Sequence, residues 1–217
     1  MFFEQVGIGM QKIIPSVSPV QYVDYVVANK GSSFNDAITI PAGATFALIA
    51  VTFYPTCNVS GVSLDGHAAT LIDSLVTANM LNLYVFRVSG FSVGANKTFV
   101  CNLDNDIYGG ANATFLFFSG VNAAPVHDHK VLVGTQNQNE TLTTDAMSSS
   151  INDMVVALVC GQAIAITMTG GGQTLVISAL YHNVEHGTGY KQGTGATDTA
   201  TCITSYGGII GVTLSPV

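Results

Sequence analysis

The sequence of 217 residues is poor in charge and contains no tryptophan. Charged residues make up 9% of the chain, against roughly 25% in an average globular protein. Six lysines and arginines stand against thirteen acidic residues, which gives a net charge of −7. Nucleic-acid binders normally carry basic stripes that displace counterions from phosphates. The shortage of basic residues therefore argues against nucleic acids and anionic membranes as partners.

Long apolar runs are also missing. The sequence has no stretch of the roughly 18 or more apolar residues that a membrane-spanning helix needs. Its first residues, MFFEQVGIGMQKIIPS, lack the basic start and long apolar core of a signal peptide. We therefore expect synthesis in a reducing cytoplasm, where cysteines remain free and behave as small buried hydrophobes. The four cysteines are Cys57, Cys101, Cys160 and Cys202.

Helix signals are nearly absent, because no long segment repeats apolar residues at helical spacing. Short runs rich in Val, Ile, Phe, Tyr and Thr instead alternate with Gly, Asn and Pro. This pattern predicts an all-β protein, an antiparallel β-sandwich or jelly roll. The expected strands cover residues 20–28, 36–40, 45–54, 59–65, 67–73, 80–88, 96–103, 112–119, 140–145, 153–160, 173–181, 185–191, 199–205 and 208–215.

Two of these strands, around ALIAV and MVVAL, are apolar on both faces, so we expect them at the centres of sheets. They also begin a weak internal repeat. FALIAV, VSLDGHAATLI, Tyr84, TFVCNL and ATFLFFSGV are matched in order by DMVVALV, TMTGGGQTLVI, Tyr190, TATCITS and GIIGVTLSPV, about a hundred residues later. No linker separates the halves, residues 36–122 and 140–217. The sequence therefore predicts one β-sandwich domain over residues 20–217, built from two weakly related halves.

The same blocks carry a resemblance to a known group of proteins. ITIPAGATFALIAVTF, VSGVSLDGHAATLI, NLYVFRVSG and FLFFSGVNAAPV are followed by DMVVALV, GGGQTL and IIGVTLSPV. This succession, over roughly residues 36–217, resembles the β-sandwich domains recurrent in phage virion structural proteins and bacterial surface proteins. The resemblance implies a non-enzymatic virion or surface module without catalytic residues.

The stretch VSGVSLDGHAATLIDS places an acid, a glycine and a histidine together at Asp65, Gly66 and His67. An Asp-Gly pair between two apolar-rich strands is a strong hairpin signal, because a type I′ turn needs positive φ at both positions. An active site would need a base oriented by a carboxylate next to a nucleophile. We predict a hairpin turn, with Asp65 pointing away from any such partner.

A second candidate is VHDHK, which places His127 and His129 on one side of an extended segment, a spacing suited to two metal ligands. His182 and His186, with Glu185 between them, could add further ligands, and a symmetry axis could gather copies of one histidine. No complete ligand set is identifiable, so we expect a solvated or intersubunit loop at VHDHK and no bound metal or cofactor.

Two further loops fail the motifs that they suggest. LDNDIYGGAN has paired acids at Asp104 and Asp106, but Phe115 stands where an EF-hand needs glutamate. TGGGQT lacks the Lys-Ser/Thr and the helix of a phosphate-binding loop. Both are expected to be polar turns.

Residues 1–19 are apolar, contain Gly and Pro, and suit neither a helix nor a strand of the sandwich. Apolar residues outside a domain's own core would be exposed in isolation. We expect an N-terminal arm that docks on a neighbouring subunit and buries Phe2, Phe3, Ile8, Ile13 and Ile14.

Together these features favour a non-enzymatic virion protein, such as a phage capsid decoration, head-fibre or minor capsid component. It would assemble as a homo-oligomer, for which a trimer is the expected form, and with other capsid or fibre subunits. The alternative is a receptor- or carbohydrate-binding β-sandwich of a fibre or cell surface, with a host glycan or receptor as its partner.

Overall fold

The computed structural model describes residues 18–30, 34–54, 57–104, 111–135, 137–162, 165–181 and 184–217, and for residues 29, 30, 123 and 181 the backbone alone. Within these ranges the regular elements are all strands, as the sequence predicts. None of the described segments forms an apolar helix of the length needed to cross a membrane.

Residues 18–119, here called unit 1, form two antiparallel sheets. The inner sheet has the order β1 (Gln21–Lys30), β9 (Ala111–Ser119), β3 (Phe46–Phe53), β7 (Asn82–Ser89) and β6 (Thr70–Val76). The outer sheet has the order β2 (Phe34–Ile40), β8 (Gly94–Leu103), β4 (Val59–Leu64) and β5 (His67–Ala68).

Residues 121–217, here called unit 2, repeat this arrangement. The inner sheet has the order β10 (Val121–Val133), β19 (Gly208–Pro216), β13 (Met154–Gly161), β16 (Val184–Gln192) and β15 (Thr174–Tyr181). The outer layer contains β11 (Glu140–Thr143), β18 (Thr201–Thr204) and β14 (Thr167–Met168), and the short pair β12 (Met147–Ser148) and β17 (Thr197–Asp198).

Each unit is a jelly roll. Counted along the chain, unit 1 has eight strands if β5 and β6 are taken together as the fifth. The first, eighth, third and sixth strands (β1, β9, β3 and β7) are then neighbours in the inner sheet, and the second, seventh, fourth and fifth (β2, β8, β4 and β5) are neighbours in the outer sheet. Strand five begins in the outer sheet as β5 and continues as β6 on the edge of the inner sheet. In unit 2, β10, β19, β13 and β16 follow the same inner order, and β11, β18 and β14 the same outer order. The two related halves are therefore two jelly rolls of one topology.

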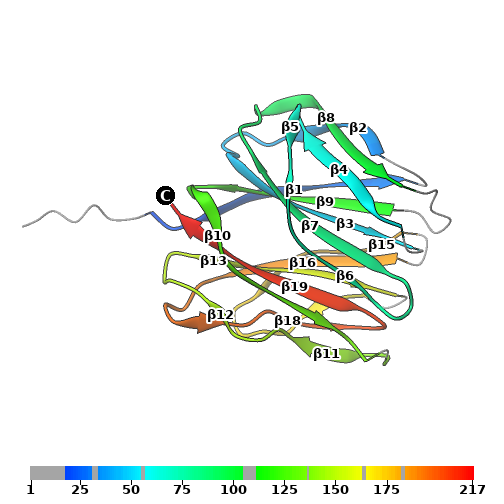
Figure 1. Cartoon of the computed structure of the whole chain (residues 1–217). Coiled ribbons are helices and arrows are strands. Elements are labelled where there is room, and N and C mark those ends of the chain that lie inside the picture. The colour runs from blue at the N-terminus through cyan, green and yellow to red at the C-terminus, as the bar shows by residue number, and fades with distance from the viewer. Residues whose placement is uncertain are drawn as a thin grey trace, which may run out of the picture.

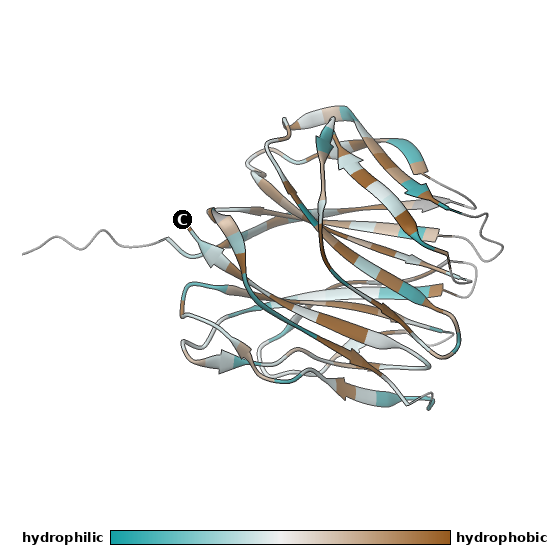
Figure 2. Ribbon diagram, viewed as in Figure 1, coloured by the Kyte–Doolittle hydropathy of each residue, from teal (hydrophilic) through white to brown (hydrophobic). Residues whose placement is uncertain are grey.

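The two jelly rolls stack into four layers (Figure 1). One core lies between the outer and inner sheets of unit 1, a second between the two inner sheets, and a third between the inner and outer layers of unit 2. Hydrophobic segments run along the strands of the two middle layers (Figure 2). Because the middle core includes side chains from both units, the halves share apolar surface.

The two inner sheets stack with their strand orders in opposite senses. Strand β6 lies against β10 and β19, β7 lies against β13, and β3 and β9 lie against β16. One side of the molecule therefore carries the edge strands β6 and β10. The edge strands β1 and β15 are their counterparts, because β1 is equivalent to β10 and β6 to β15.

The strands predicted to be apolar on both faces are central. Every residue of β3 and β13 is buried, and each strand is the middle one of its inner sheet. The four cysteine side chains are free and buried, as expected. Cys101 and Cys202 lie in equivalent strands, β8 and β18, and both contribute to outer cores.

Three expectations need correction. VHDHK is not in a loop but in β10, where pairing with β19 holds the strand despite Pro125 and the polar run. The strand expected over residues 67–73 divides at Ala69, where the chain passes from the outer to the inner sheet. Tyr84 and Tyr190 lie in equivalent strands but on opposite faces, since Tyr84 packs on the outer core of unit 1 and Tyr190 on the middle core.

Candidate functional site

The Asp65-Gly66 pair forms the predicted hairpin turn between β4 and β5. The φ angles of Asp65 and Gly66 are 52° and 79°, and Leu64 pairs with His67 across the turn. Both positive φ values are those that a type I′ turn requires.

The carboxylate of Asp65 has partners that the sequence analysis did not predict. Ser92 donates to Asp65 Oδ2 from its backbone N–H at 3.0 Å and from its hydroxyl at 2.6 Å. Lys97 Nζ lies 3.6 Å from the same oxygen. These interactions, with the Ser92 hydroxyl foremost, hold the pKa of Asp65 below its ordinary value. They tie the turn to Ser92, between β7 and β8, and to Lys97 of β8, which is a structural role.

His127 and His129 lie in β10 and bind different carboxylates. His127 Nδ1 is 2.8 Å from Asp153 Oδ2, and His129 Nε2 is 3.2 Å from Asp73 Oδ2. Asp153 also accepts a hydrogen bond from the Ser150 N–H, so its carboxylate caps a turn. Each histidine therefore has its own partner in a link between elements.

His186 lies apart from this pair, on β16, where 2% of the residue is exposed. Neither of its ring nitrogens has a hydrogen-bond partner among the described residues. His182 and the arm residues Phe2, Phe3, Ile8, Ile13 and Ile14 lie outside the described residues, as does Asp106. Over the described ranges, no group of three or more His, Cys, Asp or Glu side chains is placed to hold a metal ion.

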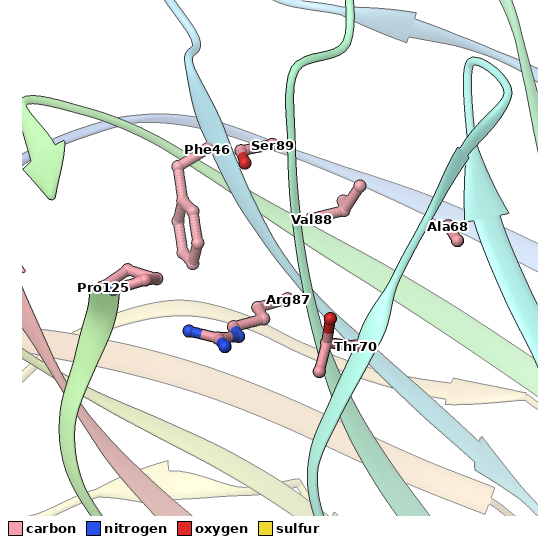
Figure 3. Close-up of a pocket in the computed structure, with 7 residues that line it drawn as sticks. All are labelled: Phe46, Ala68, Thr70, Arg87, Val88, Ser89 and Pro125. Carbon is pink, nitrogen blue, oxygen red and sulfur yellow. The ribbon is translucent and has the colours of Figure 1, made fainter. Parts of the chain in front are cut away.

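A groove that the sequence analysis did not predict lies on the side of the molecule formed by β6, β7 and β10. One hollow, with a volume of about 230 Å³, is lined by Phe46, Ala68, Thr70, Arg87, Val88, Ser89 and Pro125. A second hollow of about 430 Å³ is lined by Leu71, Ile72, Arg87, Val126, His127, Asp128 and His129. Arg87 lines both, and its guanidinium extends toward Pro125 beneath the ring of Phe46 (Figure 3).

Arg87 is the only arginine of the chain. Lys97, Lys130 and Lys191 are each paired with an aspartate. Arg87 is half-buried and has no ion pair or hydrogen bond to any described residue. The sequence contains an indication of this site. Strand alternation puts the charged Arg87 on the same face of NLYVFRV as the apolar Leu83 and Val85.

Comparisons with protein-family models, with curated proteins and with solved structures found no match.

Proposed function

We propose that the chain is a non-enzymatic structural subunit of a virus particle, such as a phage capsid decoration, head-fibre or minor capsid protein. It assembles with copies of itself, as a trimer, and with neighbouring capsid or fibre subunits. The observation that carries this proposal is an edge of the inner sheet of unit 2 with which no second described strand pairs.

That edge is strand β15, with the sequence TLVISALY. It has eight residues and no charge, it pairs with β16 on one side, and no other described strand pairs with its outer side. Leu175 and Leu180 are 44% and 55% exposed. Soluble monomers usually protect such an edge with charge, proline or a covering segment, because unpaired backbone groups recruit another strand. An edge of this kind is suited to pairing with a neighbouring subunit.

The equivalent strand of unit 1 is protected. Strand β6 carries Asp73, whose carboxylate binds His129 of β10, and β10 lies against it. Strands β6 and β15 have the same place in their jelly rolls, yet only β15 is uncharged. The exposed apolar edge is therefore specific to β15, which favours a role for it in assembly.

Two further features are consistent with assembly. A surface with few charges is easier to desolvate, because fewer ions must leave water. Jelly rolls are also frequent in viral capsids, although this is an analogy at the level of fold. In this proposal the N-terminal arm, residues 1–19, adds a second contact through Phe2, Phe3, Ile8, Ile13 and Ile14.

The experiment compares charged substitutions on the two equivalent edges. In the full chain, Leu175→Lys with Leu180→Lys should dissociate the native oligomer, because two charges would have to be buried at the interface. Val76→Lys on β6, also at an exposed site (47%), is the matched control and should leave the oligomer intact. Native mass spectrometry and sedimentation velocity measure the oligomeric state, and circular dichroism shows whether each variant is folded.

A monomeric wild-type chain at all concentrations would contradict self-assembly. An oligomer that survives both lysines on β15 would contradict the role of this edge.

The alternative function is receptor or carbohydrate binding on a fibre or cell surface. The groove around Arg87 favours it, because jelly rolls also serve as lectin domains and this groove holds an unpaired cation.

A further inference from the structure

The geometry points to the Arg87 groove as a binding site for the carboxylate of an acidic sugar residue. This site specifies a ligand chemistry for the alternative function and does not depend on assembly. It lies on the side formed by β6 and β10, whereas β15 is the opposite edge of its sheet, so the two can be tested separately.

The guanidinium of Arg87 has no hydrogen-bond acceptor or ion-pair partner among the described residues. Arginine carries five N–H donors in a fixed plane and has no acceptor, and its fork matches a carboxylate with two parallel hydrogen bonds. Arg87 is half-buried at the end of the middle core, and its guanidinium has no acceptor among the described residues. A bound carboxylate would supply both the charge and the two oxygens.

The neighbouring acidic side chains are already bound to other groups. Asp73 binds His129, and Asp153 binds His127. Asp128 accepts hydrogen bonds from the backbone N–H groups of His129 and Ser148, and Lys130 lies 3.6 Å from it. Each of these three carboxylates thus has partners, and Arg87 is not among them.

The position equivalent to Arg87 in unit 2 holds a different side chain. Leu48 of β3 pairs with Arg87, and its counterpart Val156 of β13 pairs with Tyr190. Tyr190 is therefore the counterpart of Arg87. The ring of Tyr22 from β1 stacks on Tyr190 with centroids 4.6 Å apart, whereas β10, the counterpart of β1, leaves a hollow beside Arg87. One position is closed by an aromatic stack and the other is open.

The lining of the hollow favours a sugar over a bare anion. The hydroxyls of Thr70 and Ser89 can exchange hydrogen bonds with ring hydroxyls, while Phe46 and Pro125 offer apolar surface to a pyranose face (Figure 3). Binding sites of this type combine apolar walls with a few placed polar groups. Glucuronic acid is the simplest probe, because it differs from glucose by a carboxylate in place of a hydroxymethyl group.

The test uses the single arginine as a reporter. In the ¹H–¹⁵N spectrum of the full chain, the Arg87 Nε–H signal belongs to a unique residue and needs no mutation to identify it. Titration with glucuronic acid should shift this signal saturably, and glucose at equal concentration should leave it unchanged. Acetate and a glutamate-containing peptide should bind more weakly than glucuronic acid, since they lack the ring.

Substitutions then distinguish the contribution of the positive charge of Arg87 from that of its planar guanidinium. Arg87→Gln should weaken glucuronic acid binding by about tenfold or more, and Arg87→Lys should recover only part of it because lysine lacks the planar fork. Lys130→Gln makes the same charge change at a cation already paired with Asp128 and should leave binding intact.

Three results would overturn the site: equal shifts with glucose and glucuronic acid, unchanged binding by Arg87→Gln, or tighter binding of acetate or the peptide than of the sugar acid. If Arg87→Gln fails to fold, the titration of the unmodified chain still decides the question.

Discussion

In unit 1 aromatic rings separate the inner sheet from the outer sheet, whereas in unit 2 several of the same positions hold glycine. Phe115 of β9 and Phe86 of β7 both pair with Ile49 of β3. The counterpart of Ile49 is Ala157 of β13, which pairs with Gly211 and Gly189. The outer core of unit 1 therefore contains aromatic rings at positions where the inner sheet of unit 2 has glycines, which leave space for its outer layer to approach.

The outer layer of unit 2 fills that space from the opposite side. A Cβ atom on Gly187 would lie 2.7 Å from Ile166, one on Gly189 2.7 Å from Met168, and one on Gly211 2.7 Å from Met147. The described side chains of this core include no aromatic ring. Strand order and layer spacing are therefore specified separately, the first by strand pattern and the second by side-chain volume on facing sheets.

The largest expected effect comes from removing an aromatic ring from unit 1. Phe115 is fully buried, and its ring meets Phe99 edge-on with centroids 4.6 Å apart. Phe115→Ala should lower the free energy of unfolding by about 3–5 kcal/mol, because it removes contacts and leaves a cavity. Urea denaturation measures the loss.

Hydrogen exchange in the same variant locates the effect. Amides of β2 and β8 should lose protection more than those of β11 and β18, since Phe115 faces the outer sheet of unit 1. Equal loss in both outer layers would contradict separate outer cores.

A smaller effect is expected from acid, through His186 on the face of β16 that packs on unit 1. Its counterpart on β7 is Leu83. His186 pairs with Cys160 of β13, Leu83 pairs with Thr52 of β3, and Cys160 and Thr52 occupy equivalent places in their strands. Burial lowers the pKa of His186 from 6.5 to about 4. The unfolded chain therefore binds the proton more readily than the folded one between these values, and stability falls as the pH decreases through this window.

Between about pH 7 and pH 5, His186 should cost on the order of 2 kcal/mol of unfolding free energy. His186→Asn cannot titrate and should lose that part of the pH dependence, which urea denaturation at the two pH values measures. Asp198, whose pKa is lowered to about 2 by its hydrogen bonds and by Lys191 despite its burial, titrates outside this window. If the variant keeps the full pH dependence, His186 is not the group responsible.

The sequence predicted those features that depend on local pattern. The Asp65-Gly66 turn follows from the φ values that a two-residue hairpin demands. The central places of β3 and β13 follow from runs that are apolar on both faces. These signals require no knowledge of what packs against the strand.

The features that sequence reasoning missed depend on distant partners. Strand β10 contains Pro125 and alternating His and Asp, and it becomes a strand because β19, about eighty residues later, pairs with it. The glycines of β16 and β19 resemble turn residues, yet they lie inside strands where another layer approaches closely. Arg87 is a charged residue in an otherwise apolar strand, but the open space beside it exists only once the two jelly rolls stack.

The smallest expected effect on the free energy of unfolding comes from replacing glycines inside the strands of unit 2. Gly187 has no positive φ, so alanine meets no backbone strain there. Its added Cβ would lie 2.7 Å from Ile166 Cγ2 and 2.9 Å from Ile166 Cβ, and because the backbone fixes the place of Cβ, rotation of the Ile166 side chain cannot relieve both contacts. Overpacking costs about 1–3 kcal/mol, and the lower entropy of the unfolded alanine chain offsets part of it. We expect Gly187→Ala to lose about 1 kcal/mol in urea denaturation.

Gly211→Ala is the matched control, because its two closest contacts are the terminal Cε and Sδ of Met147, while Ala200 Cβ lies farther away at 3.3 Å. Methionine is flexible at that end and can move aside, so the loss should be smaller than at Gly187. Ile166→Ala combined with Gly187→Ala should be less destabilising than the sum of the two single changes, since each makes room for the other. Strict additivity would mean that Ile166 does not set the distance between these layers.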